Sequence, residues 1–522
     1  MSKSCLLIII LSLTMLCCTK LDESFRGDVT SGQVKEDSSN AAQLLLGVYR
    51  SMYLPFTQQL SIFPLMEFTT DEAIMPTRGG DWDDNGVWRA LHEHKWLPNN
   101  DQIRQPFNHL NGTSYAATDL LRYHPTEQQA AEARFVRAWV MYLLLDFFDQ
   151  VPYRDTAESL VEPARVRRGI EALQYIIDEI RAIKPLLLPI TQNFRANRFA
   201  ADFLLMKCYL NKHIYEHRPV LPASPSAEDM NKVIELADDI ILNGNFSLSK
   251  NYFDNFAPDN STLSNENIFV LLNQPNATPD NQSFLIWLMV LHYNQGFGCC
   301  NGGSTLSDFY DLFEARDIRR GYTYPSSGFP PNPGNRTNVG FLFGQQYDWV
   351  VDTPLNDRLG NRLNFLREVH NVETVPSNIE NGGIRPLKYY PDYQSPFSPD
   401  NDFVLFRFSD VLLMKAEAIY RGGHATSAGP YGSSPLSIIN YIRTHPSRNA
   451  SPLTAITEQD LIDERGRELW WESWRRQDMI RFGTFLKPFQ EKMYDSDPKY
   501  LLFPIPEEQV ALNKYLKQNP GY

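Results

Sequence analysis

The segment 77–88, with the sequence TRGGDWDDNGVW, combines the residue types that a sugar-binding site needs. Flat tryptophan faces can stack on the apolar C–H faces of pyranose rings, and arginine and aspartate side chains can hydrogen-bond hydroxyl groups. This combination favours a neutral, weakly hydrated ligand. The alternative is that the tryptophans only pin the loop to the helices beneath it. The candidate ligand-binding residues of this region are Arg78, Asp81, Trp82, Trp88 and Trp96.

The same loop contains the opening of a calcium-binding loop, because Asp81, Asp83 and Asn85 alternate ahead of a glycine. Such a loop closes with a bidentate glutamate at about the twelfth position, where this chain has His92. The pattern therefore lacks a ligand that it needs. We expect no cofactor and no metal, and Ca²⁺ at Asp81, Asp83 and Asn85 is the alternative.

A second aromatic set lies in the middle of the chain, around a glycine-rich segment at 296–303. Glycines without a Cβ let the backbone approach a ligand closely, although the loop could equally pack on its own scaffold. Within the segment, Cys299 and Cys300 are adjacent, so either a vicinal disulfide or two free thiols is expected. The candidate ligand-binding residues here are Tyr322, Tyr324, Tyr347 and Trp349.

A search for catalytic motifs finds no HExxH, GxSxG, phosphate-binding glycine loop or CxxC pattern. The densest charged cluster, at 464–478, repeats a carboxylate every four residues at Glu464, Glu468 and Glu472. A glycosidase needs two carboxylates facing each other across a cleft. Here arginines stand near each carboxylate, which favours ionised, structural groups. We therefore predict that the chain is not an enzyme, and a surface glycoside hydrolase using this cluster is the alternative.

The composition is that of an ordinary globular protein. The chain has 522 residues, of which 43% are hydrophobic and 21% charged, which excludes wholesale disorder. The formal net charge of −13, without a long basic run, argues against nucleic acid as the main partner.

The first residues predict export. Lys3 precedes the apolar run LLIIIL at 6–11, which is too short to span a bilayer and is typical of a signal peptide. Cysteine near the end of this region favours lipoprotein processing at Cys18, with Cys17 or a plain secretory signal as alternatives. We thus expect a signal peptide at 1–17, a lipidated tether at 18–40, and membrane attachment through the lipid alone.

Hydrophobic periodicity predicts the elements that position these residues. Helical patterns at 131–149, 169–187, 198–217 and 228–243 each bear an apolar stripe, and antiparallel pairs of such helices bury their stripes together in TPR-like arrays. Residues 250–400 are rich in loops, and helices return at 404–420, 435–443 and 458–475. The predicted fold class is mainly α: a TPR-like helical-hairpin scaffold with a loop-rich, irregular ligand-binding half. We expect an N-terminal region at 41–250 and a C-terminal region at 251–522, packed as one unit.

Several segments, taken in order, resemble the SusD/RagB family of nutrient-binding lipoproteins. They are CTKLD at 18–22, the loop from Thr77 to Trp96, ARFVRAW at 133–139, DFYDLFEARDIR at 308–319, FRFSDVLLMKAEA at 406–418, ERGRELWWESWRRQD at 464–478 and QNPGY at 518–522. The ordered set spans nearly the whole chain.

The resemblance implies a helical fold with four TPR-like units and a location on the surface of the outer membrane. It implies capture of a glycan or a peptide without cleavage, and delivery to a SusC-like TonB-dependent transporter. Both aromatic regions described above match regions that commonly carry ligand sites in this family. From this resemblance we expect an oligosaccharide-binding subunit. A peptide-binding TPR-type protein is a further alternative.

Overall fold

A computed structural model describes residues 38–159, 161–190, 192–218, 224–275, 289–296, 299–324 and 332–522. The predicted signal peptide, Cys18 and most of the predicted tether lie outside these ranges. Within them, no helix combines the length and the apolar character that crossing a bilayer requires.

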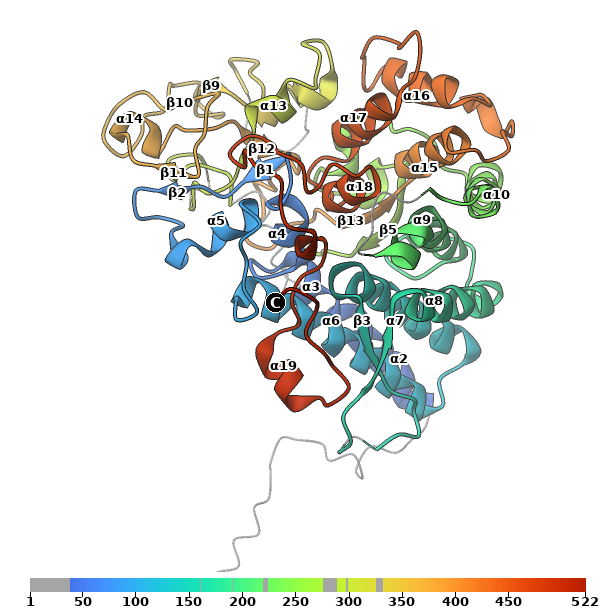
Figure 1. Cartoon of the computed structure of the whole chain (residues 1–522). Helices are drawn as coiled ribbons and strands as arrows, with labels where there is room; N and C mark the ends of the chain where they lie inside the picture. Colours follow the sequence, from blue (N-terminus) through green and yellow to red (C-terminus); the bar gives the residue numbers. More distant parts are fainter. Residues whose placement is uncertain are drawn as a thin grey trace, which may run out of the picture.

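Successive long helices pack against one another along one side of the molecule (Figure 1). α15 packs against α10 and thereby joins the C-terminal helices to the N-terminal ones. The expected mainly helical, TPR-like scaffold is thus confirmed. These helices are α2 (Ser38–Ser51), α6 (Asp101–Leu120), α7 (Glu127–Phe148), α8 (Gly169–Ile183), α9 (Arg198–His217), α10 (Ala227–Asn243), α15 (Phe408–Tyr420), α16 (Pro435–Thr444) and α17 (Glu458–Leu469).

Local capping explains where these helices begin. Thr126 and Gln129 form a reciprocal capping box at the start of α7, with the Gln129 N–H donating to Thr126 Oγ1 over 3.2 Å. Ser226 caps α10 with its hydroxyl, which accepts from the Asp229 N–H at 3.1 Å. Asp149 ends α7 in the left-handed region, with φ 55°.

The remaining elements are short and lie mainly in the loop-rich half, at the upper left of Figure 1. The short helices are α3 (Tyr53–Thr57), α4 (Ile62–Glu67), α5 (Val87–His92), α11 (Asn260–Leu263), α13 (Ser307–Tyr310), α14 (Pro376–Ile379), α18 (Arg475–Arg481) and α19 (Glu507–Leu512). The strands are β1 (Ala73–Ile74), β2 (Thr77–Arg78), β3 (Gln150–Tyr153), β4 (Arg165–Arg168), β5 (Asn267–Leu271), β6 (Ser304–Thr305), β7 (Gly321–Tyr322), β8 (Val339–Leu342), β9 (Gly344–Gln345), β10 (Asn364–Phe365), β11 (Val372–Glu373), β12 (Arg385–Leu387) and β13 (Phe403–Arg407).

Strand pairing ties distant segments together. β1 pairs with β6, β2 runs parallel to β11, and β8 lies between β7 and β12. The β1–β6 and β2–β11 pairings hold the start of the predicted binding loop at 77–88 against later segments of the chain. The antiparallel pair β5–β13 has a different role, since it lies against the helices. Phe406 of β13 packs on Trp139 of α7 and Phe203 of α9, with ring centroids 4.9 and 4.3 Å apart.

Two predicted helices are shorter than expected. Residues 404–407 belong to strand β13 rather than to the predicted helix at 404–420, because they pair with β5 and only then continue into α15. The predicted helix at 458–475 ends at Leu469, and α18 starts only at Arg475. Between them Trp471 and Ser473 have φ of 60° and 65°. Two buried carboxylates hold this turn, because the Trp471 N–H donates to Glu72 Oε1 and the Ser473 N–H donates to Glu67 Oε1, each at 2.6 Å.

Candidate functional site

The loop that carries Trp82 is a tight turn that follows β2. The Arg78 N–H donates to Asp81 O over 2.9 Å, and the Asp81 N–H donates to Arg78 O over 3.1 Å. Gly79 adopts φ +67° inside this turn, a conformation that glycine takes without steric cost. The turn leaves Asp81 exposed and Trp82 half-buried at the surface.

Arg78 lies inside the protein rather than at the surface. Only 1% of its area is exposed, and its guanidinium donates to Gly302 O at 3.0 Å, Gly382 O at 2.9 Å and Ser304 Oγ at 2.8 Å. Burial lowers the pKa of Arg78 to about 10. The prediction that Arg78 contacts a ligand is therefore wrong: its donors are used to bind neighbouring loops to β2.

Trp88 and Trp96 are also core residues, each 1% exposed. Trp88 donates its indole N–H to Asp84 Oδ2 at 2.7 Å. Trp96 donates to the Tyr522 hydroxyl at 2.7 Å and packs on Phe503 with centroids 4.7 Å apart. Neither ring presents a face to a ligand, so the prediction of stacking by these two tryptophans is corrected. Burial of their large apolar area outweighs the polar character of the loop.

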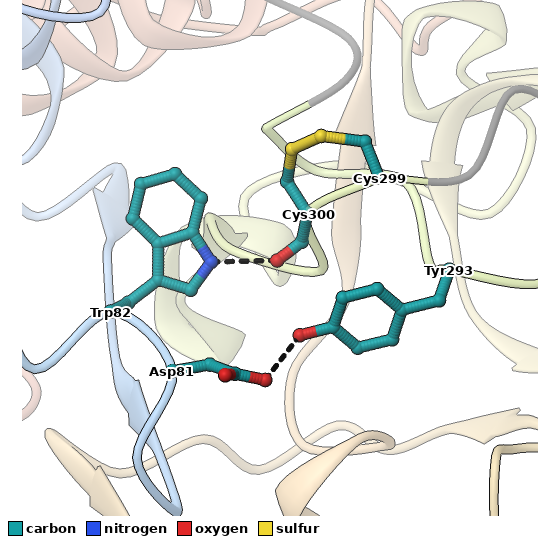
Figure 2. Close-up of a disulfide and its surroundings, with 5 residues drawn as sticks. All are labelled: Asp81, Trp82, Tyr293, Cys299 and Cys300. Carbon is teal, nitrogen blue, oxygen red and sulfur yellow. Dashed lines mark hydrogen bonds between the residues drawn. A yellow bond between two sulfur atoms is a disulfide. The ribbon is translucent and has the colours of Figure 1, made fainter.

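Trp82 is the tryptophan of this region that stays partly accessible. Its indole N–H donates to Cys300 O at 2.6 Å (Figure 2). Its ring meets Trp88 edge-on, with centroids 5.8 Å apart. Cys299 and Cys300 form a disulfide next to it, so that, of the two expected states, the disulfide is the one present. The Tyr293 hydroxyl, which lies farther from the disulfide, donates to Asp81 Oδ2 at 2.5 Å (Figure 2).

Arg358 completes the polar side of this cluster. Its guanidinium lies over the Tyr293 ring, 3.8 Å from the centroid, and its Nη2 is 3.3 Å from Asp81 Oδ2. It also pairs with Glu380, whose carboxylate contacts His292 Nε2 at 2.9 Å. Burial lowers the pKa of His292 to about 4, so this histidine is neutral at pH 7. We call Asp81, Trp82, Tyr293, Arg358 and the disulfide the Trp82 cluster.

Trp349 lies at a hollow of about 390 Å³ in the loop-rich half. Arg336 lies over the Tyr347 ring, 3.4 Å from its centroid, and pairs with Asp352 at 2.7 Å. Exposed Phe343 adds a third aromatic ring. The amide N–H groups of Gln345 donate to backbone carbonyls, Gln346 O at 2.7 Å and Leu355 O at 3.0 Å, so that its side-chain oxygen is the atom that can accept from a hydroxyl group. We call this the Trp349 hollow; further lining residues are Tyr310, Asn335 and Gln346.

The other two predicted tyrosines do not line this hollow. Tyr324 is buried and donates its hydroxyl to Asp254 Oδ1 at 2.8 Å. Burial raises the pKa of Tyr324 well above its ordinary value. Its predicted role in ligand contact is corrected to a structural one. Tyr322 is half-buried in β7, opposite Val339 of β8, and packs against the core.

One segment, 291–296, lies between the Trp82 cluster and the Trp349 hollow. It carries Tyr293 of the cluster, and Gln295 donates its amide to Gln346 Oε1 at 3.1 Å. Gly296 also lines a small cavity of about 40 Å³ together with Tyr347 and Trp349. The tertiary structure thus brings the two aromatic regions into one neighbourhood.

The calcium alternative finds no support in the geometry. Asp83 pairs with Arg89 at 2.6 Å, whereas Asp81 turns toward Tyr293 and Arg358. The two carboxylates therefore pair with different arginines, Asp83 with Arg89 and Asp81 with Arg358. Within the described part of the chain, no group of three or more His, Cys, Asp or Glu residues could hold a metal ion.

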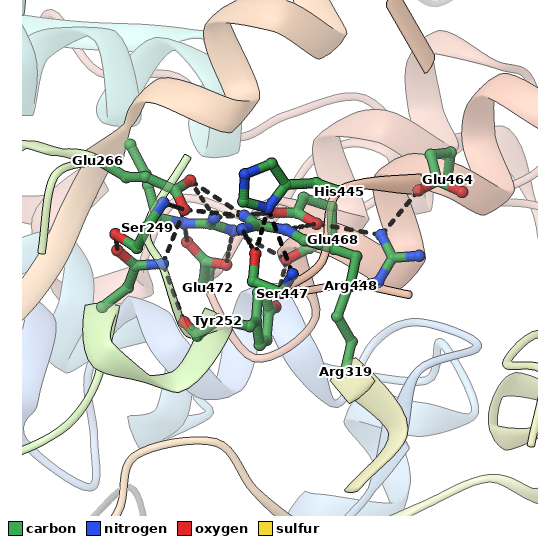
Figure 3. Close-up of polar contacts among 12 residues, drawn as sticks. Ser249, Tyr252, Glu266, Arg319, His445, Ser447, Arg448, Glu464, Glu468 and Glu472 are labelled. Carbon is green, nitrogen blue, oxygen red and sulfur yellow. Dashed lines mark hydrogen bonds and ion pairs between the residues drawn. The ribbon is translucent and has the colours of Figure 1, made fainter. Parts of the chain in front are cut away.

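The charged cluster at 464–478 is buried and paired with arginines (Figure 3). Glu468 contacts Arg448 at 2.5 Å, and Glu464 contacts Arg319 at 2.7 Å. Burial alone would raise the pKa of Glu464, but the nearby arginines, Arg319 foremost, lower it to about 2. This arrangement agrees with the predicted structural role of the carboxylates.

Sequence reasoning missed Tyr293, Arg358 and Glu380 as site residues. Tyr293 is 212 positions from Asp81, and Arg358 is 277 positions from it. No local motif connects such distant residues. The nearest signal is the aromatic content at 287–300 together with the glycine-rich segment at 296–303, which predicts a ligand contact in this region.

Comparisons with known proteins agree with this architecture. The sequence model of the SusD family matches residues 287–522. The starch-binding protein SusD of Bacteroides thetaiotaomicron is 25% identical over 500 residues, covering 88% of this chain and 85% of that protein. The SusD-like protein P38 of Formosa agariphila is 27% identical over 153 residues, covering 27% of this chain and 28% of that protein.

Solved structures show the same fold. A SusD superfamily protein from Parabacteroides distasonis has a TM-score of 0.71 and 17% identity, covering 93% of this chain and 99% of its own. The surface glycan-binding protein A from B. thetaiotaomicron, solved in complex with laminarihexaose, has a TM-score of 0.67 and 15% identity, covering 92% and 99%. The SusD family match thus covers the C-terminal region, the starch-binding relative is similar over most of the chain, and the solved structures share the fold of the chain.

Proposed function

We propose that this protein is a lipid-anchored, cell-surface subunit that binds a neutral oligosaccharide and passes it, chemically unchanged, to a SusC-like TonB-dependent transporter. The observation that carries the proposal is the Trp82 cluster beside the Trp349 hollow. Together they offer accessible aromatic rings next to carboxylate, hydroxyl and amide groups. Carbohydrate sites combine such groups because a sugar ring has an apolar face and a rim of hydroxyls.

The charges of this surface favour a neutral glycan. Arg358 is 47% exposed but pairs with Asp81 and Glu380, and Arg336 pairs with Asp352. An acidic sugar would have to compete with these carboxylates for the guanidinium groups, at a cost in electrostatic energy. The names of two similar proteins support a glycan as the ligand, since one binds starch and another was solved with laminarihexaose.

A glycan panel tests the binding part of the proposal. We expect the purified protein to be retarded in gels that contain a neutral polysaccharide, with α-glucans and laminarin tested first and sulfated and uronic-acid glycans included for comparison. Trp82→Ala and Trp349→Ala should each weaken retention about 10-fold or more, because each removes a stacking surface. Tyr115→Ala changes a 47% exposed ring on α6, outside the cluster and the hollow, and serves as the matched control.

The same incubations separate the alternatives. Release of new reducing ends would favour a glycoside hydrolase, whereas retention without turnover supports capture. Retention of peptides instead of glycans would contradict the oligosaccharide. If neither Trp82→Ala nor Trp349→Ala alters retention, this site is wrong.

Anchoring and partnership need separate measurements. Lipid labelling of the expressed full chain should disappear in Cys18→Ala, and persistence of the label in Cys18→Ala but not in Cys17→Ala would move the anchor to Cys17. Purification of the native protein in mild detergent should co-isolate a TonB-dependent barrel. Purification without such a barrel would contradict the transporter partnership.

A further inference from the structure

The Cys299–Cys300 disulfide lies at the surface within the Trp82 cluster. Cys299 is exposed and Cys300 is half-buried against the core. Figure 2 shows the two sulfur atoms on the side of the cluster opposite Asp81, with the Trp82 ring to their left and the Tyr293 ring below them. Trp82 is tied to this segment directly by the hydrogen bond from its indole N–H to Cys300 O at 2.6 Å.

The backbone that follows the disulfide is firmly held. The Asn301 N–H donates to Leu291 O at 2.9 Å, and the Gly302 and Gly303 N–H groups both donate to Met289 O, at 2.8 and 2.9 Å. Buried Asn301 also accepts a hydrogen bond from Arg385 at 2.9 Å. The disulfide is therefore presented from a fixed support, so that little conformational freedom remains to be lost when a ligand contacts it.

The chemistry of this surface matches one face of a sugar ring. Two bonded sulfur atoms are polarisable and apolar, and a disulfide has no S–H donor. The Trp82 indole continues the apolar surface on one side. The Asp81 carboxylate and the Tyr293 hydroxyl supply polar groups on the other side. A pyranose ring with one apolar C–H face and a rim of hydroxyls would satisfy both kinds of surface at once.

We propose that the Cys299–Cys300 disulfide is itself a ligand contact, an apolar platform that packs with Trp82 against the C–H face of a neutral pyranose. The proposal rests on the proposed glycan-binding function and adds a residue pair to it. Two separate thiols would not replace the platform, because each would rotate independently and carry a polar S–H group. An exported protein is exposed to oxidising conditions, in which such a disulfide persists.

Protection from reduction tests direct contact in the wild-type protein. The protein is treated with dithiothreitol, with and without the best retained glycan of the panel, and the thiols formed over time are alkylated and counted by peptide mass spectrometry. If the glycan covers the disulfide, reduction slows about 10-fold at a glycan concentration ten times the dissociation constant, because only the free protein reacts. A glycan that the protein does not retain, at equal concentration, is the control.

The variant Cys299→Ser/Cys300→Ser gives the second measurement. Its affinity for the same glycan should fall about 5- to 10-fold through loss of apolar contact area. Dithiothreitol should weaken binding by the wild type but not by this variant. If the variant does not fold, as judged by its thermal unfolding, the protection experiment alone decides.

The outcomes distinguish this inference from the function on which it rests. A wild-type protein that retains no glycan refutes the proposed function and the platform with it. Retention without protection from reduction, or with two alkylatable thiols before any reductant is added, overturns the platform and leaves glycan binding intact. Unchanged affinity in a folded double-serine variant does the same.

Discussion

Replacing Arg407 by methionine should reveal how strongly the buried ion network holds the fold. Arg407 is 1% exposed and contacts three carboxylates. Its Nη1 is 2.9 Å from Glu266 and 2.7 Å from Glu468, and its Nη2 is 2.7 Å from Glu472. Methionine has a similar length and fills most of the volume, so the main change is the loss of one buried positive charge.

The size of the effect follows from what remains. Glu266 and Glu468 keep Arg448, and Glu472 keeps Lys388. Three carboxylates lose a partner, yet only one negative charge is left without compensation. Breaking a buried ion pair by removing one partner costs about 3–5 kcal/mol. We therefore expect a loss of about this size in the free energy of unfolding at pH 7, rather than three times that amount.

The loss should shrink in acid. Burial raises the pKa of Glu468, but Arg448 and Arg407 outweigh this effect and hold it well below the ordinary value. In the wild type this carboxylate stabilises the fold above its unfolded-state pKa and loses that effect as the pH falls through the folded pKa. In Arg407→Met the uncompensated carboxylate takes up a proton more readily. The two proteins should therefore converge in stability below about pH 4.5, where the wild type loses the contribution of this carboxylate and the variant has less to lose.

Urea unfolding followed by tryptophan fluorescence measures this difference, with the m-values compared to confirm that the same surface unfolds. Arg104→Met is the matched control. Arg104 pairs with Asp101 on α6, where the two side chains are 30% and 56% exposed. Exposed pairs contribute about 0–1 kcal/mol. A loss in Arg407→Met no larger than in this control, or one that grows on acidification, would refute the reasoning.

Three further predictions follow from buried and crowded positions. Trp96→Ala should lower the free energy of unfolding in urea by about 3–5 kcal/mol without a specific effect on glycan affinity, because Trp96 is buried. Trp82→Ala should lower the free energy of unfolding less and should weaken glycan retention. Equal losses of stability in the two variants would contradict this assignment of one ring to the core and the other to the site. Burial raises the pKa of Glu67 from 4.5 to about 7, so the fold favours the protonated form of this carboxyl group. The stability gained from this protonation is complete below the unfolded-state pKa and is lost as the pH rises through 7. Glu67→Gln should flatten the pH dependence of the unfolding midpoint between pH 5 and about 8, and an unchanged slope would count against this assignment. A Cβ at Gly302 would lie 2.7 Å from Trp82 Cε2, from Met75 Sδ and from Met289 O, so Gly302→Ala should displace the indole and lower glycan affinity in titrations, with thermal unfolding used to confirm that the variant folds. Gly80→Ala, whose Cβ meets open space, should leave the affinity unchanged. Equal affinities in the two folded variants would show that the indole position is unimportant.

The helical scaffold could be predicted from the sequence because its causes are local. The apolar stripe of 131–149 and the Thr126 capping box involve residues three or four positions apart, and α7 forms there. The same reasoning failed at 404–407, whose helical pattern gave way to pairing with β5. It also failed at Trp471, whose N–H donates to Glu72 Oε1 at 2.6 Å, a partner 399 positions away. A contact of that range leaves no trace in local periodicity.

The sequence by itself determined the helical repeats, the pairing of buried carboxylates with arginines, and the ordered motifs that resemble the SusD family. It also placed aromatic residues in the two regions that the fold brings together. Only the tertiary structure decided which of them a ligand could reach. Trp82 and Trp88 are six positions apart on one loop, yet the first stays partly accessible and the second is sealed in the core. Side-chain exposure depends on what other segments pack against each residue: here Trp88 packs against Phe68, whereas Trp82 reaches out to Cys300.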